Sequence, residues 1–352
     1  MKKFFAFILA LLGLQVPTAC GQMPFENRNV DDFAALLDTG DVQLLDVRTP
    51  EEYAANHLVG AINIDVKQAD FLRSALSRLD KSRAVAVYCR SGRRSAEAAR
   101  TLVDEGFKVV NLKGGILAWT NAGKTVTKDT REVDVFVGKT GKRIAFHALM
   151  HASIRIEFDG KEIEIDPVGK LGDRTTDYAM MPKADIIFVT HEHGDHYDPQ
   201  AIQTLSAEKT RLVTNRRCAD MLGKGQVMKN GDADDVEGIR VEAVPAYNTT
   251  PDRTQFHPKG RDNGFVLTLD GLRVYIAGDT EDIPEMATLG DIDIAFMPCN
   301  QPYTMTTDQL VKAARMVKPR VLFPYHYGKT DVTGVPEALK DLGTDVRIRH
   351  YE

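Results

Sequence analysis

The chain has 352 residues, of which 43% are hydrophobic and 27% charged, and its formal net charge is −5. This length exceeds one ordinary hydrophobic core and predicts two domains, while the composition is that of a globular protein without extended disorder. The sequence contains no block of lysine and arginine and no alternation of basic and aromatic residues, so nucleic acid is excluded as the expected partner.

The first residues have the pattern of an export signal. Lys2 and Lys3 precede an uncharged, largely apolar run at residues 4–14, which suits a signal peptide and is too short to cross a bilayer. Small residues then lead to Cys20, and this segment resembles the cleavage box of bacterial lipoproteins. We expect a signal peptide at residues 1–19, lipid on Cys20 and a tether at residues 20–25. The protein would then be exported, either periplasmic or held at a membrane by its lipid anchor only; simple cleavage after residue 19 and an uncleaved anchor are the alternatives.

Four cysteines occur in the chain, at positions 20, 89, 218 and 299. If Cys20 carries lipid and Cys89 is a nucleophile, only two remain, so we do not expect a disulfide framework. Cys218 and Cys299 are interpreted as small buried side chains and not as reactive thiols.

Residues 26–124 alternate short apolar strands with amphipathic helices. This order predicts a small α/β domain with a parallel sheet, whose site lies at the carboxyl ends of the strands. The expected strands are residues 42–47, 84–88 and 109–112, and the expected helices are residues 31–37, 71–79 and 95–105.

A loop with one cysteine follows the predicted strand at residues 84–88. Its sequence is Cys89-Arg90-Ser91-Gly92-Arg93-Arg94, and it leads directly into a predicted helix. The backbone N–H groups of such a loop and the helix N-terminus favour an anion at the sulfur, and three arginines add positive charge. Both effects lower the pKa of a thiol, so the loop is suited to hold Cys89 as a thiolate or a persulfide.

Four motifs in this region resemble the rhodanese family: residues 46–53 (Asp-Val-Arg-Thr-Pro-Glu-Glu-Tyr), residues 57–64 (His-Leu-Val-Gly-Ala-Ile-Asn-Ile), the Cys89 loop and residues 113–119 (Lys-Gly-Gly-Ile-Leu-Ala-Trp). The resemblance implies that Cys89 accepts sulfane sulfur from a donor and carries it as a persulfide. It also implies that Gly92 and Arg94 shape the loop while Asp46 and Arg48 brace it. The family usually has Gly-His-Ile-Pro-Gly where this chain has Asn-His-Leu-Val-Gly at residues 56–60. An inactive binding module with the same fold is the alternative.

The polar residues 125–131 are predicted to link this domain to a second one at residues 132–352. The second domain begins with a strand meander whose tight turn is Asp159-Gly160, and strands later alternate with helices. The expected strands are residues 143–146, 153–158, 161–165, 185–189, 211–213, 241–244, 265–269, 272–277, 292–297 and 321–323, and the expected helices include residues 199–206 and 307–317.

Three imidazoles and a carboxylate lie together in the loop Thr190-His191-Glu192-His193-Gly194-Asp195-His196. The loop follows the apolar run at residues 185–189, which is predicted to be a buried strand. Imidazole nitrogens and carboxylate oxygens are ligands that Zn²⁺ and Fe²⁺ take, whereas crowded imidazoles without a metal repel one another as they protonate. The loop therefore predicts a metal site, and a solvated polar loop is the alternative.

Three further candidate ligands, His257, Asp279 and His326, lie at or near the ends of predicted strands. Each has a glycine or proline close by, which lets the backbone turn sharply and direct one side chain inward. Each of these histidines alone would more often be an ordinary core or surface residue. Together with the His191 loop, they predict one metal centre.

Six motifs span the second domain: residues 151–153 (His-Ala-Ser), 165–167 (Ile-Asp-Pro), the His191 loop, 278–280 (Gly-Asp-Thr), 302–305 (Pro-Tyr-Thr-Met) and 324–328 (Pro-Tyr-His-Tyr-Gly). Together they resemble the metallo-β-lactamase superfamily, in particular its branches similar to L-ascorbate-6-phosphate lactonase and to the phospholipase D-type enzymes acting on N-acyl phosphatidylethanolamine. The resemblance implies a four-layer αββα sandwich that binds two divalent metal ions, zinc in the first place, with manganese or iron as alternatives.

The same resemblance assigns the ligands. His191, His193 and His257 would bind the first ion, Asp195, His196 and His326 the second, and Asp279 would bridge the two. His257 departs from the family pattern because it follows an insertion at residues 248–255 instead of following its strand directly.

Other residues near the expected centre are assigned by side-chain chemistry. Asp195 or Asp279 could accept the proton of the attacking water, and His326 could orient or stabilise a developing oxyanion. His151 and Asp166 are expected to orient the ligands or to line the pocket. The tyrosines Tyr303, Tyr325 and Tyr327 either assist at the oxyanion or serve in packing.

Hydrolysis of an ester, lactone, amide or phosphoester in a small molecule is the expected reaction, with Cys89, Asp195, Asp279 and His326 as the catalytic residues of the two domains. A persulfide dioxygenase with one iron ion, supplied with sulfur by Cys89, is one alternative. A sulfur-sensing lipoprotein without catalysis is another. The metal-domain motifs and the order of the domains favour the hydrolase.

Overall fold

The computed structural model describes residues 25–40, 42–127 and 132–351. The expected signal peptide, Cys20 and all but the last residue of the tether therefore lie outside the described residues. Within the described part, no helix combines the length and the apolar composition that a bilayer span requires. The described start of the expected linker packs on the first domain, since Thr125 accepts a hydrogen bond from Trp119 and Thr127 pairs with His57.

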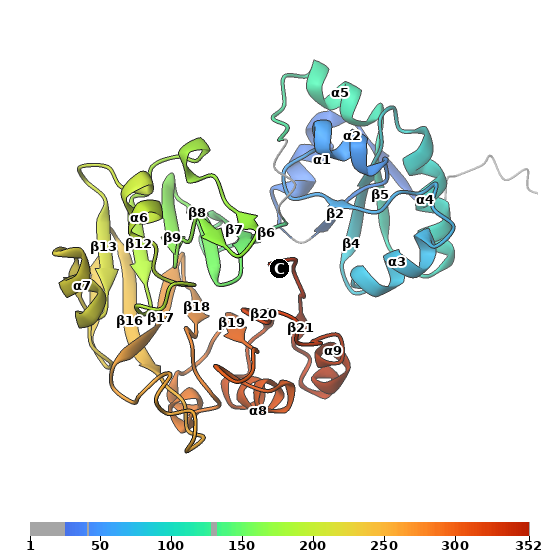
Figure 1. The fold of residues 1–352 in the computed structure, drawn as a ribbon. Helices are drawn as coiled ribbons and strands as arrows, with labels where there is room; N and C mark the ends of the chain where they lie inside the picture. Colours follow the sequence, from blue (N-terminus) through green and yellow to red (C-terminus); the bar gives the residue numbers. More distant parts are fainter. Residues whose placement is uncertain (1–24, 41, 128–131, 352) are drawn as a thin grey trace, which may run out of the picture.

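The first domain is built on a parallel five-stranded sheet with the strand order β1-β5-β4-β2-β3 (Figure 1). Its strands are β1 (Glu26–Arg28), β2 (Val42–Asp46), β3 (Ile62–Asn63), β4 (Ala84–Tyr88) and β5 (Val109–Leu112), and its helices are α1 (Val30–Leu37), α2 (Pro50–Ala55), α3 (Phe71–Arg78), α4 (Arg93–Asp104) and α5 (Gly115–Asn121).

Alternation along β4 explains the layers of this domain. Val85 and Val87 pack with α3 and α4 on one face of the sheet, while Ala86 and Tyr88 pack with α1 and α5 on the other. The expected small α/β fold is confirmed. The sequence pattern missed α2, although Thr49 and Glu52 form a capping box at its start and Pro50 occupies the first helical turn.

The second domain contains two seven-stranded sheets. The first has the order β14-β13-β12-β9-β8-β7-β6 and the second the order β15-β16-β17-β18-β19-β20-β21. The first sheet comprises β6 (Val133–Val137), β7 (Arg143–Met150), β8 (Ser153–Phe158), β9 (Lys161–Ile165), β12 (Ile186–Val189), β13 (Arg211–Thr214) and β14 (Gln226–Val227). The second comprises β15 (Ala233–Val236), β16 (Ile239–Ala246), β17 (Asp262–Leu269), β18 (Leu272–Ile276), β19 (Ile294–Pro298), β20 (Val321–Tyr325) and β21 (Asp345–Val346). The short strands β10 (Lys170–Leu171) and β11 (Arg174–Thr175) pair with each other apart from both sheets.

Apolar side chains from both sheets form one core between them, and helices cover the outer faces (Figure 1). In β12, Ile186 and Phe188 face this inner core, whereas Ile187 and Val189 pack against α6 (Pro199–Leu205). Helix α8 (Thr307–Val317) packs its apolar side on the outer face of the second sheet. The remaining helices of four or more residues include α7 (Arg216–Leu222) and α9 (Val335–Ala338). This arrangement confirms the expected four-layer αββα sandwich.

Several strands are longer than the sequence pattern predicted. Strand β17 begins at Asp262 and not at Phe265, and β20 continues through Pro324 to Tyr325. Polar residues and proline interrupt the apolar pattern at these ends, but backbone pairing continues, as between Ala246 and Asp262. The added residues are those that lead into the candidate metal centre.

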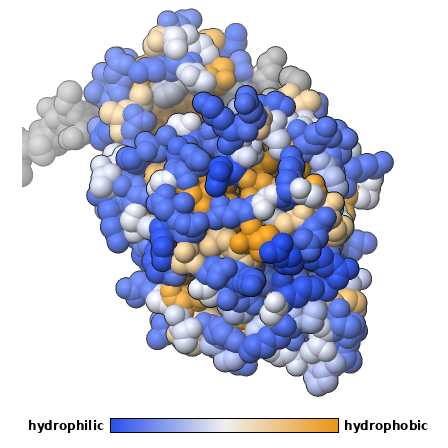
Figure 2. All heavy atoms as spheres, turned by 90° about the vertical axis from the view of Figure 1, so that its left-hand side faces the viewer, coloured by the Kyte–Doolittle hydropathy of each residue, from blue (hydrophilic) through white to orange (hydrophobic). Residues whose placement is uncertain are grey.

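The surface is polar over most of the face shown in Figure 2, where apolar side chains gather near the middle. In the described part of the chain, the exposed large hydrophobic side chains are Leu76, Leu117, Met221 and Tyr303. All three cysteines at described positions, Cys89, Cys218 and Cys299, are buried and form no disulfide. Burial raises the pKa of the Cys218 thiol to about 12 and that of Cys299 to about 11, so these two are unreactive as expected.

The outermost strands β6 and β21 of the two sheets are joined by buried ion pairs. Asp134 of β6 accepts hydrogen bonds from Arg347 (2.8 Å) and Arg349 (2.7 Å), which follow β21. Burial alone would raise the pKa of Asp134, but the two arginines outweigh it and lower the pKa from 3.8 to about 2. The carboxylate therefore ties the C-terminal segment to the first sheet at neutral pH.

We predict that Asp134→Asn lowers the free energy of unfolding of the metal-free protein by about 2 kcal/mol or more at pH 7, because the charged pair is lost and two arginines remain buried. A lowered pKa stabilises the fold above the unfolded value near 3.8, and this stabilisation is lost as the pH falls through about 2. In urea unfolding, the difference in free energy of unfolding between wild type and variant should therefore be about 1 kcal/mol smaller at pH 3 than at pH 7. The control Asp341→Asn removes only an exposed pair with Arg315 and should have little effect. A difference in free energy of unfolding that does not change with pH would contradict the pairing of ionised Asp134 with the two arginines.

Candidate metal centre

The His191 loop is held by one buried carboxylate, Asp166. Asp166 accepts hydrogen bonds from Thr190 N and Thr190 Oγ1, both at 2.7 Å, and lies 2.8 Å from His196 Nδ1. Thr190 Oγ1 is also 3.0 Å from His191 Nδ1. These contacts fix both rings through Nδ1 and leave Nε2 directed away from Asp166. Asp166 thus lies where an orienting residue would contact the rings, and Thr190 is a partner of the two rings that the sequence did not reveal.

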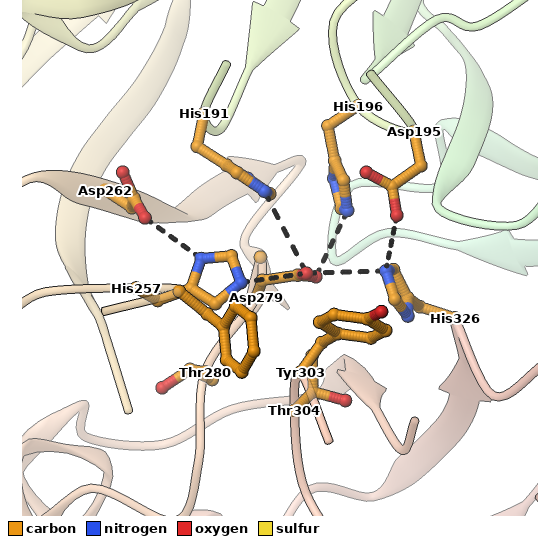
Figure 3. Close-up of polar contacts among 12 residues, drawn as sticks. His191, Asp195, His196, His257, Asp262, Asp279, Thr280, Tyr303, Thr304 and His326 are labelled. Atoms are coloured by element: carbon orange, nitrogen blue, oxygen red, sulfur yellow. Dashed lines mark hydrogen bonds and ion pairs between the residues drawn. The ribbon is translucent and has the colours of Figure 1, made fainter. Parts of the chain in front are cut away.

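Four imidazoles converge on the carboxylate of Asp279, which follows β18 (Figure 3). His196 Nε2 lies 3.1 Å from Asp279 Oδ1, and the Nε2 atoms of His257 and His326 each lie 3.4 Å from Oδ2. His191 Nε2 is 3.9 Å from the same oxygen. The predicted ligands therefore come together although they belong to distant segments of the chain and to both sheets.

Three sets of side chains each have their ligand atoms within 4.8 Å of one another, and two of the sets share His191. They are His191, His193 and His257; His191, His196 and Asp279; and His151, Asp195 and His326. The first set matches the expected ligands of one ion. The remaining expected ligands are divided between the other two sets, with His151 as an addition.

His257 reaches the centre from the loop between β16 and β17. Its ring is buried and its Nδ1 lies 3.0 Å from Asp262 Oδ2, while Arg261 donates hydrogen bonds to both oxygens of Asp262. Ring centroids of His257 and His193 are 4.8 Å apart. The insertion thus brings His257 back to the position of a ligand. Asp262 was missed in the sequence, where a carboxylate five residues after a candidate histidine was the available signal.

The loop that carries His257 is anchored next to Asp279. Glu281 is fully buried and accepts hydrogen bonds from the backbone N–H groups and hydroxyls of Thr249 and Thr250, at 2.7 to 2.9 Å. Thr280 and Tyr247 also bond to each other across the same junction. These hydrogen bonds therefore tie the segment with Asp279 to the loop with His257.

The donor set fits divalent metal ions. Among the described residues, no hydrogen-bond partner is found for Nε2 of His191, His196, His257 or His326, nor for Asp279 Oδ1, although all these atoms are buried. They approach one another at ion-pair distances without the alignment of hydrogen bonds. Buried polar atoms normally have partners, so several unpartnered nitrogens aimed at one carboxylate indicate an ion of the type that imidazole and carboxylate bind.

Electrostatics prepare two of these groups, His191 and Asp279, to bind cations. Burial, reinforced by His196, holds the pKa of His191 well below its usual value, so this ring is neutral at pH 7. Burial would raise the pKa of Asp279, but the imidazoles of His326 and His196 outweigh it and hold the pKa well below its usual value. Asp279 is therefore ionised and His191 offers a free lone pair, as metal binding requires.

Burial would lower the pKa of His196 and His257, but Asp279 together with Asp166 and Asp262 outweighs it and raises both pKa values. A cation would therefore displace protons from these two rings.

The three tyrosines considered above have different environments. Tyr325 is fully buried, and its hydroxyl accepts a hydrogen bond from Gly278 N, beside Asp279, so it supports the centre from behind. Tyr327 donates its hydroxyl to the carbonyl of Arg349. Tyr303 is 45% exposed and packs edge-on against Phe256. Figure 3 shows it near Asp279 and His326. Of the three, Tyr303 has the exposure that contact with a substrate needs.

The Cys89 loop lies at the carboxyl end of β4, as predicted. Cys89 Sγ accepts hydrogen bonds from Gly92 N (3.2 Å) and from Ser95 Oγ (3.4 Å). Burial would raise the pKa of the Cys89 thiol, but hydrogen bonds from Ser95 and the loop backbone outweigh it and lower the pKa. Ser95 was not recognised in the sequence, because a serine in a helical turn is not distinctive.

The residues expected to shape and brace this loop form ion pairs. Arg94 binds both oxygens of Glu52 at 2.7 Å, and Arg48 binds Asp46 at 2.6 to 3.0 Å in a buried pair. Arg94 therefore fixes α2 to the loop as well as adding charge. Gly115 of α5 lets the Cys89 loop pack closely against this helix, because a Cβ at this position would lie only 2.3 Å from the Cys89 carbonyl oxygen.

Both domains match known families. The family described as Beta-lactamase superfamily domain matches residues 145–326, and the family described as Rhodanese-like domain matches residues 29–122. A UPF0173 metal-dependent hydrolase from Thermococcus onnurineus is 30% identical over 207 residues, and one from Pyrococcus abyssi is 32% identical over 214 residues. Each of these alignments covers 56% of this chain and 91% of the relative.

Two solved structures extend this agreement. A candidate metal-dependent hydrolase from Parabacteroides distasonis is 53% identical, with a TM-score of 0.61, over 63% of this chain and 100% of that one. A metallo hydrolase from Ignicoccus hospitalis is 25% identical, with a TM-score of 0.50, over 58% of this chain and 94% of that one. With the ligand geometry above, these matches lead to one conclusion: the chain belongs to the metallo-β-lactamase superfamily as a metal-dependent hydrolase, and it carries a rhodanese-like domain on its N-terminal side.

Proposed function

We propose that the C-terminal domain hydrolyses an ester, lactone, amide or phosphoester bond of a small molecule with two divalent metal ions, preferably zinc. The observation that carries the proposal is the convergence of buried Nε2 atoms from the His191 loop, His257 and His326 on Asp279. The ligand sets support two ions with Asp279 between them. The motifs favour the lactonase-like and phospholipase D-like branches of the superfamily.

Ions bound by these residues would supply Lewis acidity toward a carbonyl or phosphoryl oxygen and would lower the pKa of water. Asp279 is 2% exposed, whereas the Asp195 side chain is 31% exposed and still lies 3.4 Å from His326 Nε2. Asp195 thus adjoins the centre and also reaches solvent, so it is the carboxylate suited to take the proton of the attacking water. His326 lies 3.4 Å from both carboxylates and fixes their separation, and Tyr303 lies where it could contact the substrate.

We predict that the metal-free protein takes up two equivalents of Zn²⁺ or Mn²⁺, that hydrolysis of model esters or phosphoesters returns with them, and that chelation abolishes it. Asp279→Asn should bind at least one ion fewer and lose roughly 1,000-fold or more in kcat/KM, because Asp279 contacts rings of both ligand sets. Elemental analysis, metal titration and rates on a substrate panel measure this. The control Asp252→Asn alters an exposed carboxylate on the His257 loop and should behave as wild type.

A different result would favour the dioxygenase. One iron ion per chain, with oxygen uptake on a low-molecular-weight persulfide and no hydrolysis, would contradict the proposed hydrolase. If the protein binds no metal, the result would favour the other alternative, a sulfur-sensing lipoprotein without catalysis.

We also propose that the N-terminal domain is a sulfurtransferase in which Cys89 carries sulfane sulfur as a persulfide. The lowered pKa of Cys89 and the donors Gly92 N and Ser95 Oγ support this proposal, because they stabilise an anionic sulfur. Cys89 is itself buried, so the sulfur donor is a small molecule such as thiosulfate.

Ser95→Ala is expected to raise the pKa of Cys89, since a hydrogen bond to the thiolate is lost, and to slow thiosulfate-to-cyanide sulfur transfer about tenfold at pH 7. The pH dependence of alkylation by iodoacetamide measures the pKa. Ser82→Ala, at an exposed serine that bonds Asp80, serves as the control. Cys89→Ser should abolish sulfur transfer and leave hydrolysis intact. Loss of both activities would show that the two domains form one site, contrary to the proposal.

The export signal suggests that the protein acts outside the cytoplasm, and we propose that lipid on Cys20 anchors it there. In a bacterial host, Cys20→Ser should move the protein from the membrane fraction to the soluble exported fraction, while Cys89→Ser should stay with the membranes. Fractionation followed by mass spectrometry of the N-terminus tests this. A Cys20→Ser variant that remains in the membrane would instead indicate an uncleaved anchor.

A further inference from the structure

One buried histidine, which is not among the ligands assigned above, adjoins the expected second metal site. His151 lies in the turn between β7 and β8, is 6% exposed, and places Nε2 3.3 Å from Asp195 Oδ2. The same oxygen of Asp195 lies 3.4 Å from Nε2 of His326, which follows β20. One carboxylate oxygen is therefore contacted by imidazole nitrogens from both sheets.

These separations are those of ligands around one ion. Nitrogen and oxygen ligands about 2.1 Å from a tetrahedrally bound ion lie about 3.4 Å from each other. The ligand atoms of His151, Asp195 and His326 all lie within 4.8 Å of one another. Asp195 Oδ2 already has this separation from both histidines, at 3.3 Å from His151 and 3.4 Å from His326.

The direction of the His151 ring separates it from the orienting residues. Asp166 and Asp262 contact their histidines at Nδ1, at 2.8 and 3.0 Å, so that Nε2 of each ring faces the centre. His151 instead contacts Asp195 through its own Nε2, at 3.3 Å. It thus points the same atom at the centre as the ligands His196 and His257 do.

His151 and its neighbour His326 share an uncommon backbone conformation. His151 has φ 55° and His326 has φ 47°, a left-handed conformation that residues other than glycine rarely adopt. His151 N donates to the carbonyl of Tyr351 (2.8 Å), and His326 N donates to the carbonyl of His151 (3.2 Å). The two rings pack with centroids 3.8 Å apart. Such strain persists where neighbouring contacts hold it, and it is concentrated at functional sites.

We propose that His151 is an additional ligand of the second metal ion, binding beside Asp195 and His326. This inference rests on the two-ion centre proposed above and extends its donor set. With His196 and Asp279, the second ion would have five protein donors, more than a four-coordinate zinc site uses. The second site would then accept manganese, iron or five-coordinate zinc, and the first would remain a three-histidine site.

Metal titration of the metal-free protein tests this with His151→Ala and His151→Gln. Gln places an N–H close to the position of His Nε2, so it can still bond to Asp195, but it is a poor ligand. Both variants should bind the first Mn²⁺ ion with wild-type affinity and the second more than about tenfold more weakly. Loss of a residue that only hydrogen-bonds to a ligand already weakens metal binding about tenfold, so loss of a ligand should weaken it at least as much. His350→Gln, at a 76% exposed histidine that pairs with Glu132, is the control.

Two outcomes would overturn the inference. If Gln restores second-site affinity to within tenfold of wild type, His151 only orients Asp195 by a hydrogen bond. If wild type itself binds fewer than two ions, the two-ion proposal fails together with this one. If wild type and both variants bind two ions with the same affinities, only the role of His151 is contradicted. Thermal unfolding of the metal-free variants shows whether they fold. If they do not, pulsed magnetic resonance on wild type with ¹⁵N-histidine and Mn²⁺ at the second site decides: nitrogen coupling from three imidazoles supports the inference, and coupling from two contradicts it.

Discussion

Imidazole nitrogens that are buried without hydrogen-bond partners are unfavourable, and this constraint shapes the C-terminal domain. Nε2 atoms of His191, His196, His257 and His326 all face Asp279, and the charge of that carboxylate alone does not satisfy them. Divalent ions would relieve both the unpartnered nitrogens and the buried negative charge. The imidazole lone pairs and the charge of the carboxylate thus call for the same partner, a bound cation.

The fold holds several of the candidate ligands in place through buried carboxylates. Asp166 fixes the His191 loop at the end of β12, Asp262 fixes His257 at the start of β17, and Glu281 joins the His257 loop to the segment of Asp279. The first sheet supplies the His191 loop and His151, and the second supplies His257, Asp279 and His326. Because the two sheets share one core and are joined at their outer strands by Asp134 and its arginines, the two halves of the centre keep their separation.

Sequence reasoning succeeded where the signal was local. The Cys89 loop and the His191 loop each follow an apolar strand directly, so both the strand and the site could be predicted from one short segment. His257 was placed by family resemblance, since spacing along the chain gives no reason for a residue in an insertion to return to the centre. Asp262, Thr190, Ser95 and Glu281 are ordinary polar residues, and tertiary contacts alone give them their roles. Short strands such as β1 and β3 have too few residues for a periodic pattern, and β17 was shortened because Asp262 and Asn263 interrupt its apolar run.

The central claim is that two metal ions lie on either side of Asp279. Anomalous diffraction at the metal absorption edge, on crystals of the metal-loaded protein, measures this most directly. We predict two anomalous peaks, one among His191, His193 and His257 and the other beside Asp195 and His326, both in contact with Asp279. A single peak, or peaks remote from Asp279, would contradict it.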